Sequence, residues 1–372
     1  MMGLEMLEKF AEWRALIGSF LDEIKRDRLV LYKSVHQIGP DALERLIAFC
    51  MRGKMIRGGL VCFGHTLFAG DLPQDTIAAG GVLELFHSAL LIHDDIMDRD
   101  TYRRGKLSLF SQYKKIAGDS GVAESGHLGE SLGICVGDIA FFLAFELLSE
   151  IEGKSNKVSK LVLQSARELS FVGIAQMADV IRGATSALID ADTPVGAILG
   201  NVSNEAETIN IYRYKTGRYT FSLPLMVGAT LAGCDDRALF TLEKLGESLG
   251  ILFQLKDDEI GLFGNPDETG KPIGSDVREG KKTLFYHYLV AHANDKERKK
   301  IEEIYGNPAT GEDEVSYAID LLAKYSIREQ IGSRAEEYAK KARAICESLD
   351  NLHVGGRELL EDLVAYSTSR TR

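Results

Sequence analysis

Two pairs of adjacent aspartates stand in otherwise apolar stretches of the chain. Asp94 and Asp95, with Asp98 one helical turn later, follow a long apolar run, and Asp257 and Asp258 interrupt a second one. Residues four apart share one face of a helix, so Asp94 and Asp98 would hold two like charges side by side. If the two clusters face each other, their oxygen-only ligands suit Mg²⁺, which fills its octahedron with water and phosphate oxygens. We therefore expect magnesium-assisted phosphate chemistry and not merely a solvated helix end.

Basic residues gather in short groups beside glycines. Four such groups occur, around Lys54 and Arg57, Arg103 and Arg104, Lys215, and Lys271. Lys54 and Arg57 open a predicted helix, where both can point at one anion near the positive end of the helix dipole. One such group is usually a surface feature, but four groups and two aspartate pairs can, with metal, hold two diphosphates. The glycine patterns of a P-loop and of a dinucleotide fold do not occur in a strand–helix context.

The composition favours helices. The chain has 372 residues, 45% of them hydrophobic and 8% aromatic, with only seven prolines, which is typical of a globular all-α protein with a large core. Apolar residues at three- and four-residue spacing predict eleven helices and no convincing strand. The predicted helices cover about 4–30, 41–52, 57–69, 75–98, 131–152, 157–185, 218–233, 236–261, 281–293, 316–349 and 356–368. Short charged loops join them, so we expect one domain.

Charge and cysteine usage exclude several classes of function. The net charge of -11, without a basic tail, argues against a nucleic-acid partner. Five scattered cysteines without C-x-x-C spacing indicate neither a disulfide framework nor a thiolate zinc site, and a reducing cytoplasm fits best. The N-terminal segment carries too many charges for a secretory signal. Since Gly137 and Asp138 break the longest apolar run, Leu132 to Leu148, we expect no stable membrane insertion.

Several motifs in order make the chain resemble the trans-isoprenyl diphosphate synthases, also called polyprenyl synthetases, and within them the geranylgeranyl diphosphate synthases. The motifs lie between about residues 50 and 290, and they are Gly53-Lys54…Arg57, Glu84…His87…His93-Asp94-Asp95…Asp98, Arg103-Arg104-Gly105, Gly173…Gln176…Asp179, Lys215-Thr216-Gly217, and Gln254…Asp257-Asp258 with Lys271…Ser275-Asp276…Lys281. The resemblance implies a single domain over residues 1–372, built as one large helical bundle of the isoprenoid synthase type with a central active-site cavity. It also implies a homodimer.

The resemblance further implies roles for individual residues. Asp94 and Asp98 would hold two Mg²⁺ ions and Asp257 a third, with Asp95 and Asp258 as nearby acids. The allylic diphosphate would be bound by Arg103, Lys215 and Lys271. The diphosphate of isopentenyl diphosphate would be bound by Lys54, Arg57, His87 and Arg104. Lys215 and Thr216 carbonyls, with Gln254 and Arg103, would serve catalysis by stabilising the developing charges.

The activity implied is a head-to-tail (1'-4) condensation of isopentenyl diphosphate with an allylic diphosphate, giving a linear all-trans prenyl diphosphate. Two other functions stay open: a class I terpene cyclase, which needs no acceptor diphosphate site, and a non-catalytic partner subunit of another synthase. The chain departs from the family pattern at Gly261, where a third aspartate of the second cluster is common. That departure bears on the third metal site.

Product length in this family depends on residues one and two turns before the first aspartate cluster. Here Ala89 lies five residues before Asp94, Leu90 four before, and Phe86 eight before. At about 1.5 Å per residue, Phe86 is roughly 12 Å from Asp94 along the helix. Because Ala89 cannot close a tunnel as an aromatic ring would, we expect a C20 product, with C25 or longer as the alternative if Phe86 points aside.

Overall fold

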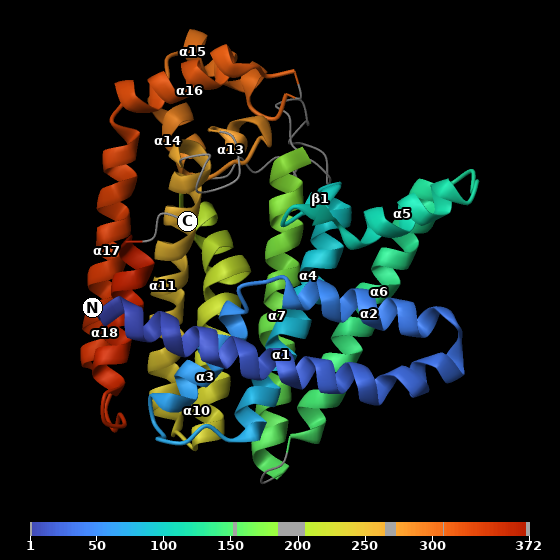
Figure 1. Cartoon of the computed structure of the whole chain (residues 1–372). Helices are drawn as coiled ribbons and strands as arrows, with labels where there is room; N and C mark the ends of the chain where they lie inside the picture. The colour runs from blue at the N-terminus through green and yellow to red at the C-terminus, as the bar shows by residue number, and fades with distance from the viewer. Residues whose placement is uncertain (1, 152–154, 185–204, 265–272, 308, 370–372) are drawn as a thin grey trace, which may run out of the picture. The chain divides into compact units, whose positions relative to one another are not determined.

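The computed structural model describes residues 2–151, 155–184, 205–264, 273–307 and 309–369, and most of these residues are helical (Figure 1). The predicted all-α class is therefore confirmed. The chain divides into two compact units, which are described separately. Unit 1 consists of Met1–Ala166, Leu223–Leu239 and Asn351–Arg357, and unit 2 of Arg167–Ser222, Phe240–Asp350 and Glu358–Arg372.

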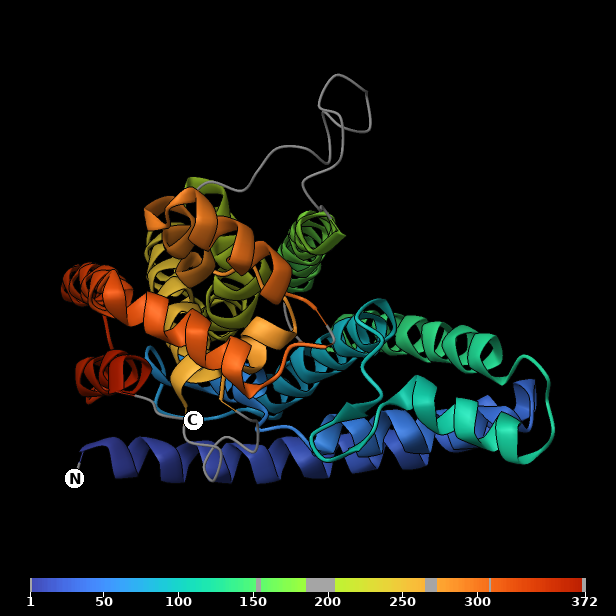
Figure 2. The ribbon, with the colours of Figure 1, turned by 90° about the horizontal axis from the view of Figure 1, so that it is seen from above.

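Unit 1 is built around one buried helix, α4. Its helices are α1 (Met2–Val35), α2 (Ile38–Met51), α3 (Ile56–Thr66), α4 (Gln74–Met97), α5 (Leu109–Asp119), α6 (Ser125–Glu150), the first part of α7 (Ser155–Ala184), and α10 (Leu223–Ala232). Helix α4 packs against α1, α3 and α6, and its residues 79–86 are all buried. The long helix α1 runs past α2, α3 and α4 (Figure 2). The end of α4 that carries the first aspartates is thus held by a packed core.

Helix α10 lies directly on α3. All its residues from Leu223 to Thr230 are buried, and glycines allow the two backbones to touch. A Cβ on Gly228 would stand 2.1 Å from the Val61 carbonyl oxygen, and one on Gly64 would stand 2.5 Å from the Leu225 carbonyl oxygen. Only glycine at these positions permits so close a crossing. The segment Leu223–Leu239 therefore belongs to unit 1, although the residues before and after it in the sequence belong to unit 2.

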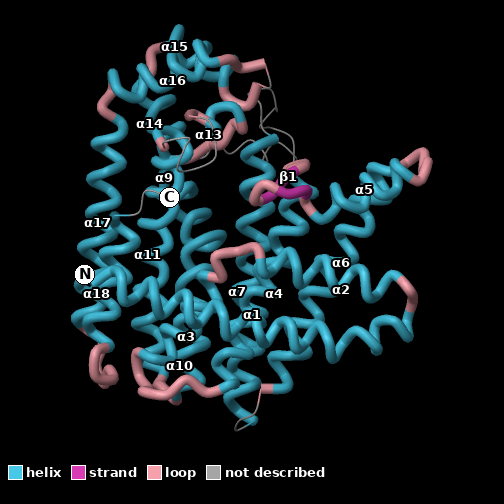
Figure 3. The backbone as a smooth tube through the Cα atoms, viewed as in Figure 1, coloured by secondary structure: helices cyan, strands magenta, loops and turns pink. Residues whose placement is uncertain are grey.

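A short antiparallel ribbon follows α4. Strands β1 (Tyr102–Arg103) and β2 (Lys106–Leu107) pair Tyr102 with Leu107 and Arg103 with Lys106, as the magenta segment in Figure 3 shows. The turn between them has positive φ at both Arg104 (53°) and Gly105 (72°), the combination found in type I′ hairpin turns. The prediction of no strand was wrong here, because a two-residue strand is too short to leave a periodic pattern.

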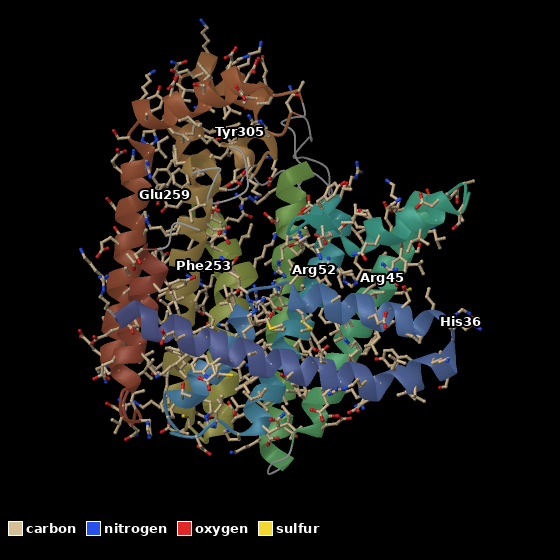
Figure 4. The ribbon with its side chains drawn as sticks, viewed as in Figure 1. His36, Arg45, Arg52, Phe253, Glu259 and Tyr305 are labelled. Carbon is tan, nitrogen blue, oxygen red and sulfur yellow. The ribbon has the colours of Figure 1, made fainter. Side chains whose placement is uncertain are left out.

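Unit 2 surrounds helix α11 (Asp236–Phe263). Its other elements are the part of α7 from Arg167 onward, α9 (Glu205–Ile211), the π-helix η1 (Tyr212–Ser222), α13 (Ser275–Arg278), α14 (Leu284–His292), α15 (Asp295–Ile304), α16 (Glu312–Lys324), α17 (Ile327–Glu347) and α18 (Gly356–Ser369). Phe253 and Glu259, labelled in Figure 4, lie on α11. The Phe253 ring meets Phe221 of η1 edge-on at 5.4 Å, and Glu259 Oε1 accepts a 2.9 Å bond from Arg328 Nε of α17. These contacts tie α11 to its neighbours.

Several helices depart from their predicted bounds for local reasons. The predicted helix over 316–349 is two helices, because Ser326 takes a left-handed backbone (φ 50°) between α16 and α17. Helix α15 has few apolar residues but begins with a capping box, in which Asn294 accepts from the Glu297 amide and Glu297 from the Asn294 amide. Such a reciprocal cap stabilises a helix start without hydrophobic periodicity. Helix α5 and the π register of η1 were not predicted either.

Two helices, α4 and α6, are long and apolar enough by length and composition to cross a membrane. Core helices of soluble proteins pass the same test, and 72% of the apolar window of α4 is buried inside the protein, against 44% for α6. Helix α6 begins at Ser125 and continues through Gly137 and Asp138. We expected Gly137 and Asp138 to interrupt this segment, but the helix is continuous through them. These two residues alone therefore do not exclude a membrane span.

Candidate active site

The first aspartate cluster occupies the C-terminal end of α4 in unit 1. Asp94 is partly exposed and Asp98, the residue that caps the helix, is exposed, whereas Asp95 is fully buried. Asp94 and Asp98 are one turn apart, and the Asp98 amide donates to the Asp94 carbonyl at 2.8 Å. The helix therefore presents two accessible carboxylates along one face and hides the third.

Arg103 of the ribbon holds this cluster together. Its Nε donates to Asp95 Oδ1, and its Nη2 lies 3.5 Å from Asp94 Oδ2 and 3.3 Å from Asp100 Oδ2. Burial raises the pKa of Asp95 to about 6, and Asp100 and Asp94 also raise it, while Arg103 opposes the rise. The predicted residue Arg103 thus already contacts the acids of the cluster.

The donor set of this cluster fits Mg²⁺. It offers carboxylate oxygens only, and Asp95 Oδ2 is buried without a hydrogen bond from any described residue. Among the described ranges, no three His, Cys, Asp or Glu side chains are gathered into a ready-made metal cage. Carboxylates arranged singly and in pairs leave coordination positions for water and phosphate oxygens, which is how Mg²⁺ is usually held at phosphate-transfer sites.

Four basic or imidazole side chains predicted for one diphosphate lie close to each other in unit 1. Lys54 is exposed in the loop before α3, and Arg57 lies in the first turn of α3. A Cβ on Gly53 would stand 2.7 Å from Arg104 Nη1, so the hairpin arginine reaches the loop that carries Lys54. The pKa of His87 is lowered well below its usual range, first by burial and then by the guanidinium groups of Arg57, Arg104 and Arg103. Burial and the nearby cations thus both disfavour the charged form of His87.

The second aspartate cluster lies on α11 in unit 2, where Asp257 is exposed and Asp258 is buried. Neutral donors satisfy Asp258: Tyr212 OH donates to Oδ2, and Gln254 Nε2 donates to Oδ1 at 2.8 Å. Thr216 Oγ1 donates to Gln254 Oε1 at 2.9 Å, which fixes the orientation of that amide. Burial raises the pKa of Asp258 to about 7, and the bonds from Tyr212 and Gln254 oppose the rise.

The predicted residues Lys215 and Thr216 lie in the π-helix η1. Lys215 Nζ forms an ion pair with Asp179 Oδ2 of α7. A Cβ on Gly250 would stand 2.0 Å from the Gly217 Cα, so η1 rests directly on α11. π-helical turns are frequent at functional sites, because the wider register changes which carbonyls are free. Lys271, predicted for the same diphosphate, lies outside the described residues.

The position of the missing third aspartate is filled from another helix. A Cβ on Gly261 would stand 2.4 Å from Asp276 Oδ2 and 2.6 Å from Asp276 Oδ1. The Asp276 side chain is buried, and its Oδ1 lies 3.1 Å from Lys281 Nζ. A side chain at 261 would therefore have to displace the carboxylate that α13 places beside α11. The sequence contains Asp276 in a motif, but it gives no sign of this contact.

The residues predicted to set product length lie one to two turns before Asp94. Phe86 and Ala89 are fully buried and Leu90 is partly exposed. The Phe86 ring meets Phe145 of α6 edge-on at 4.8 Å, with Phe141 at 6.3 Å. Two aromatic rings of α6 therefore fix the orientation of Phe86. The roles of all three residues stay predictions.

Sequence reasoning missed two residues of these clusters. Tyr212 binds Asp258, and its hydroxyl also accepts from the Leu284 amide at 2.9 Å. Glu84 was part of a motif without a role, and its Oε1 accepts from the Gly58 amide at 2.8 Å. A tyrosine three residues before Lys215, and an acid inside an apolar helix, were the only signals that could have found them.

Known proteins resemble this chain over most of its length. The family model described as polyprenyl synthetase matches residues 41–322. The geranylgeranyl diphosphate synthase of Sulfolobus acidocaldarius is 29% identical, over 79% of this chain and 80% of its own. The geranylfarnesyl diphosphate synthase of Aeropyrum pernix is 29% identical, over 90% of this chain and 96% of its own. Among solved structures, one is a geranylgeranyl pyrophosphate synthase of Corynebacterium glutamicum, complexed with isoprenyl diphosphate and magnesium. It superposes on this chain with a TM-score of 0.85 at 23% identity, and the match covers 96% of this chain and 99% of that one.

Proposed function

We propose a specific reaction for this chain, which belongs to the polyprenyl synthetase family. It joins isopentenyl diphosphate head-to-tail (1'-4) to an allylic diphosphate and releases one diphosphate, so that a linear all-trans prenyl diphosphate grows by one isoprene unit. The proposal extends the shared function of the family, prenyl transfer, to the reacting atoms and the side chains that bind them.

One observation supports this reaction above the alternatives: two chemically different groups of side chains lie along α4, carboxylates at its C-terminal end and, further back, a histidine near basic residues of α3 and of the hairpin turn. Asp94 and Asp98 offer carboxylates for metal, and His87, seven residues earlier, lies beside Arg57 and Arg104. Seven residues correspond to roughly 10 Å of helix. An enzyme that ionises one substrate alone has no use for the second group, whereas a condensing enzyme needs both.

The donor-side residues would act as follows. Asp94, Asp98 and Asp257 would hold about three Mg²⁺ ions, and such ions neutralise diphosphate charge as the allylic C–O bond breaks. Arg103, Lys215 and Lys271 would bind the departing diphosphate. Asp95 and Asp258 would orient the groups around them, since both are buried and hydrogen-bonded.

The second substrate is the acceptor, isopentenyl diphosphate, and its negative diphosphate needs basic side chains as well. Lys54, Arg57, His87 and Arg104 would bind the diphosphate of isopentenyl diphosphate, whose double bond attacks the allylic C1. The carbonyls of Lys215 and Thr216 and the amide oxygen of Gln254 would stabilise the transient positive charge on carbon. Attack leaves a cation on the acceptor, and the released diphosphate would take a proton from the adjacent carbon, whose C–H electron pair becomes the new double bond.

We favour a C20 product, with C25 or longer as the alternative. The small side chain of Ala89 supports this choice, since an aromatic ring at that position would shorten a tunnel, and Phe86 is packed against Phe145 at 4.8 Å. Ala89→Phe is expected to shorten the main product by at least one isoprene unit, read by mass spectrometry. The assigned floor is wrong if the product length does not change.

Assembly and location complete the proposal. We infer one functional domain over residues 1–372 and a homodimer in the cytoplasm, with neither a nucleic-acid partner nor stable membrane insertion. Large apolar side chains exposed on α6, among them Ile134 (47%) and Phe142 (74%), support a partner surface there. The net charge of -11 opposes a nucleic-acid partner.

The deciding experiment incubates the purified chain with isopentenyl diphosphate, Mg²⁺ and each of dimethylallyl, geranyl and farnesyl diphosphate, with products read by mass spectrometry. A ladder that ends at one linear prenyl diphosphate supports the proposal and gives its length. Hydrocarbon formed from an allylic diphosphate alone would indicate a class I terpene cyclase. No reaction with any starter would indicate a partner subunit.

A further inference from the structure

A buried carboxylate caps the helix that carries Arg57. Glu84 lies in the middle of α4 with only 3% of its surface exposed, and its Oε1 accepts from the Gly58 amide of α3 at 2.8 Å. The residue before α3, Met55, has a left-handed backbone (φ 52°) and makes no side-chain cap. The first amides of a helix need acceptors, and a negative group there also interacts favourably with the helix dipole. Glu84 provides this cap from a different helix.

The seam between α3 and α4 is shaped for this contact. A Cβ on Gly58 would stand 2.9 Å from the Gly80 carbonyl oxygen and 3.2 Å from Glu84 Cγ. Glycine at position 58 therefore lets the start of α3 approach α4 closely enough for the Glu84 carboxylate to reach its amide. The helix start, and with it Arg57, is fixed by a buried bond and not by its own loop.

Glu84 is also the counter-charge of the neighbouring cations. The pKa of its carboxyl is raised by burial, and the Gly58 amide, Arg57 and Arg104 act against that rise. Arg104 takes a left-handed backbone (φ 53°) at the hairpin turn, with its guanidinium over Gly53. Two guanidinium groups that converge on one anion repel each other when the anion is absent. A negative charge near them, such as that of Glu84, offsets part of that repulsion.

We propose that Glu84 is a positioning residue for the acceptor diphosphate, holding the start of α3 with Arg57, and the Arg104 guanidinium, in the arrangement that binds isopentenyl diphosphate. The inference rests on the proposed function. Glu84 does not touch substrate in this scheme, because its side chain is buried and its carboxylate accepts from the Gly58 amide. Its effect should therefore fall on one substrate and not on the other.

The experiment compares Glu84→Gln with the full-length wild-type chain. The glutamine keeps the size and one acceptor oxygen but removes the charge. Calorimetric titration with isopentenyl diphosphate alone should show a Kd about ten-fold higher, and its KM should rise with it. The KM of the allylic diphosphate should change less than two-fold. Glu84→Ala, which removes the acceptor as well, should raise the Kd of isopentenyl diphosphate further.

A matched control is Glu168→Gln. Glu168 is also buried (2% exposed), and its two oxygens accept from Arg218 at 2.6 and 2.9 Å. This change should lower the thermal midpoint of unfolding, and it should not change the KM of one substrate more than that of the other. The inference is overturned if Glu84→Gln raises both KM values by the same factor, or leaves the Kd of isopentenyl diphosphate unchanged. A wild-type chain that makes no prenyl product would instead refute the proposed function.

Discussion

The aspartates of α4 and those of α11 are arranged alike but are held by different partners. Each cluster has one buried acid beside one that reaches the surface. On α4 the buried Asp95 is bound by a guanidinium, whereas on α11 the buried Asp258 is bound by a phenol and an amide. A charged partner favours the ionised carboxylate, and neutral donors favour it less. Burial raises the pKa of both carboxyls, to about 6 for Asp95 and about 7 for Asp258, and these partners act against the rise.

The third position of each cluster differs as well. Asp98 ends the first cluster, but Gly261 ends the second, because the Asp276 carboxylate occupies the adjacent space. The first cluster can thus contribute two accessible acids from one helix, and the second only Asp257. We infer that the two clusters carry unequal shares of metal binding, and this inequality can be tested.

Removing an accessible acid should therefore cost more on α4 than on α11. Asp94→Ala is expected to lower kcat by about 10³-fold and Asp257→Ala by about 10²-fold, because each removes charge stabilisation of the leaving diphosphate. Product formation at several Mg²⁺ concentrations measures both. Asp119→Ala, at an exposed i,i+4 pair with Lys115, should leave kcat unchanged. Equal losses at the two clusters would contradict the comparison.

Restoring the third acid on α11 should destabilise the protein. In Gly261→Asp the new Cβ would lie 2.4 Å from Asp276 Oδ2, so we expect a loss of about 3 kcal/mol in the free energy of unfolding. Gly332→Ala, a helical glycine whose added Cβ would meet no atom within 4 Å, is the control and should gain up to about 1 kcal/mol. Chemical denaturation measures both changes.

The double variant Gly261→Asp/Asp276→Gly sharpens the same test. It moves the carboxylate from α13 to α11 and removes the clash, so part of the lost stability should return. No recovery would mean that the clash with Asp276 is not the cause of the destabilisation.

Neutralising the two buried acids should have opposite effects on stability near pH 7. Asp95→Asn leaves Arg103 facing a neutral amide, and we expect a loss of about 2 kcal/mol, discounted for the part of that guanidinium open to solvent. Asp258→Asn should instead raise stability by about 2 kcal/mol, because the neutral amide avoids the cost of ionising a buried carboxyl whose pKa is raised to about 7, and it keeps an acceptor for the Tyr212 hydroxyl. Both values come from denaturation at pH 7, with circular dichroism as a check on folding. A loss of stability for Asp258→Asn would contradict the comparison.

The pH dependence of stability offers the finest distinction. The folded pKa of Asp258, about 7, exceeds its ordinary value of 3.8, so the folded state binds the extra proton between these two pH values. The stability that Asp258 contributes is complete below pH 4 and is lost as the pH rises through 7. In EDTA, the thermal midpoint of the wild-type chain should fall relative to that of Asp258→Asn between pH 5 and 8. Parallel curves would show that Asp258 does not titrate in this range.

Much of this arrangement was predictable from sequence because it depends on local spacing. Asp94 and Asp98 share a face in any helix, and Arg57 lies in the first turn of α3 as predicted, with Lys54 in the loop just before that helix. The long helices were predicted for the same reason, since their apolar faces repeat every three to four residues.

The parts that could not be predicted depend on contacts between distant residues. Glu84 and Gly58 are 26 residues apart, and Tyr212 and Asp258 are 46 apart. In the sequence, Gly261 stands where a third metal-binding aspartate is common. Only the structure shows that the Asp276 carboxylate lies beside it. The ribbon around Arg104 is too short to leave an alternating pattern, and the π register of η1 has no periodicity that a 3.6-residue analysis detects.

The placement of α10 also affects the order in which the chain can fold during synthesis. Unit 1 takes in residues 223–239 only after the unit 2 segment 167–222 has left the ribosome. At roughly 5–20 residues per second, that interval lasts several seconds. Throughout it, the face of α3 around Val61 lacks the helix that later touches its backbone. The apolar face of α3 must therefore be shielded until α10 has been synthesised. Until then unit 1, which carries Asp94 and Arg57, is incomplete.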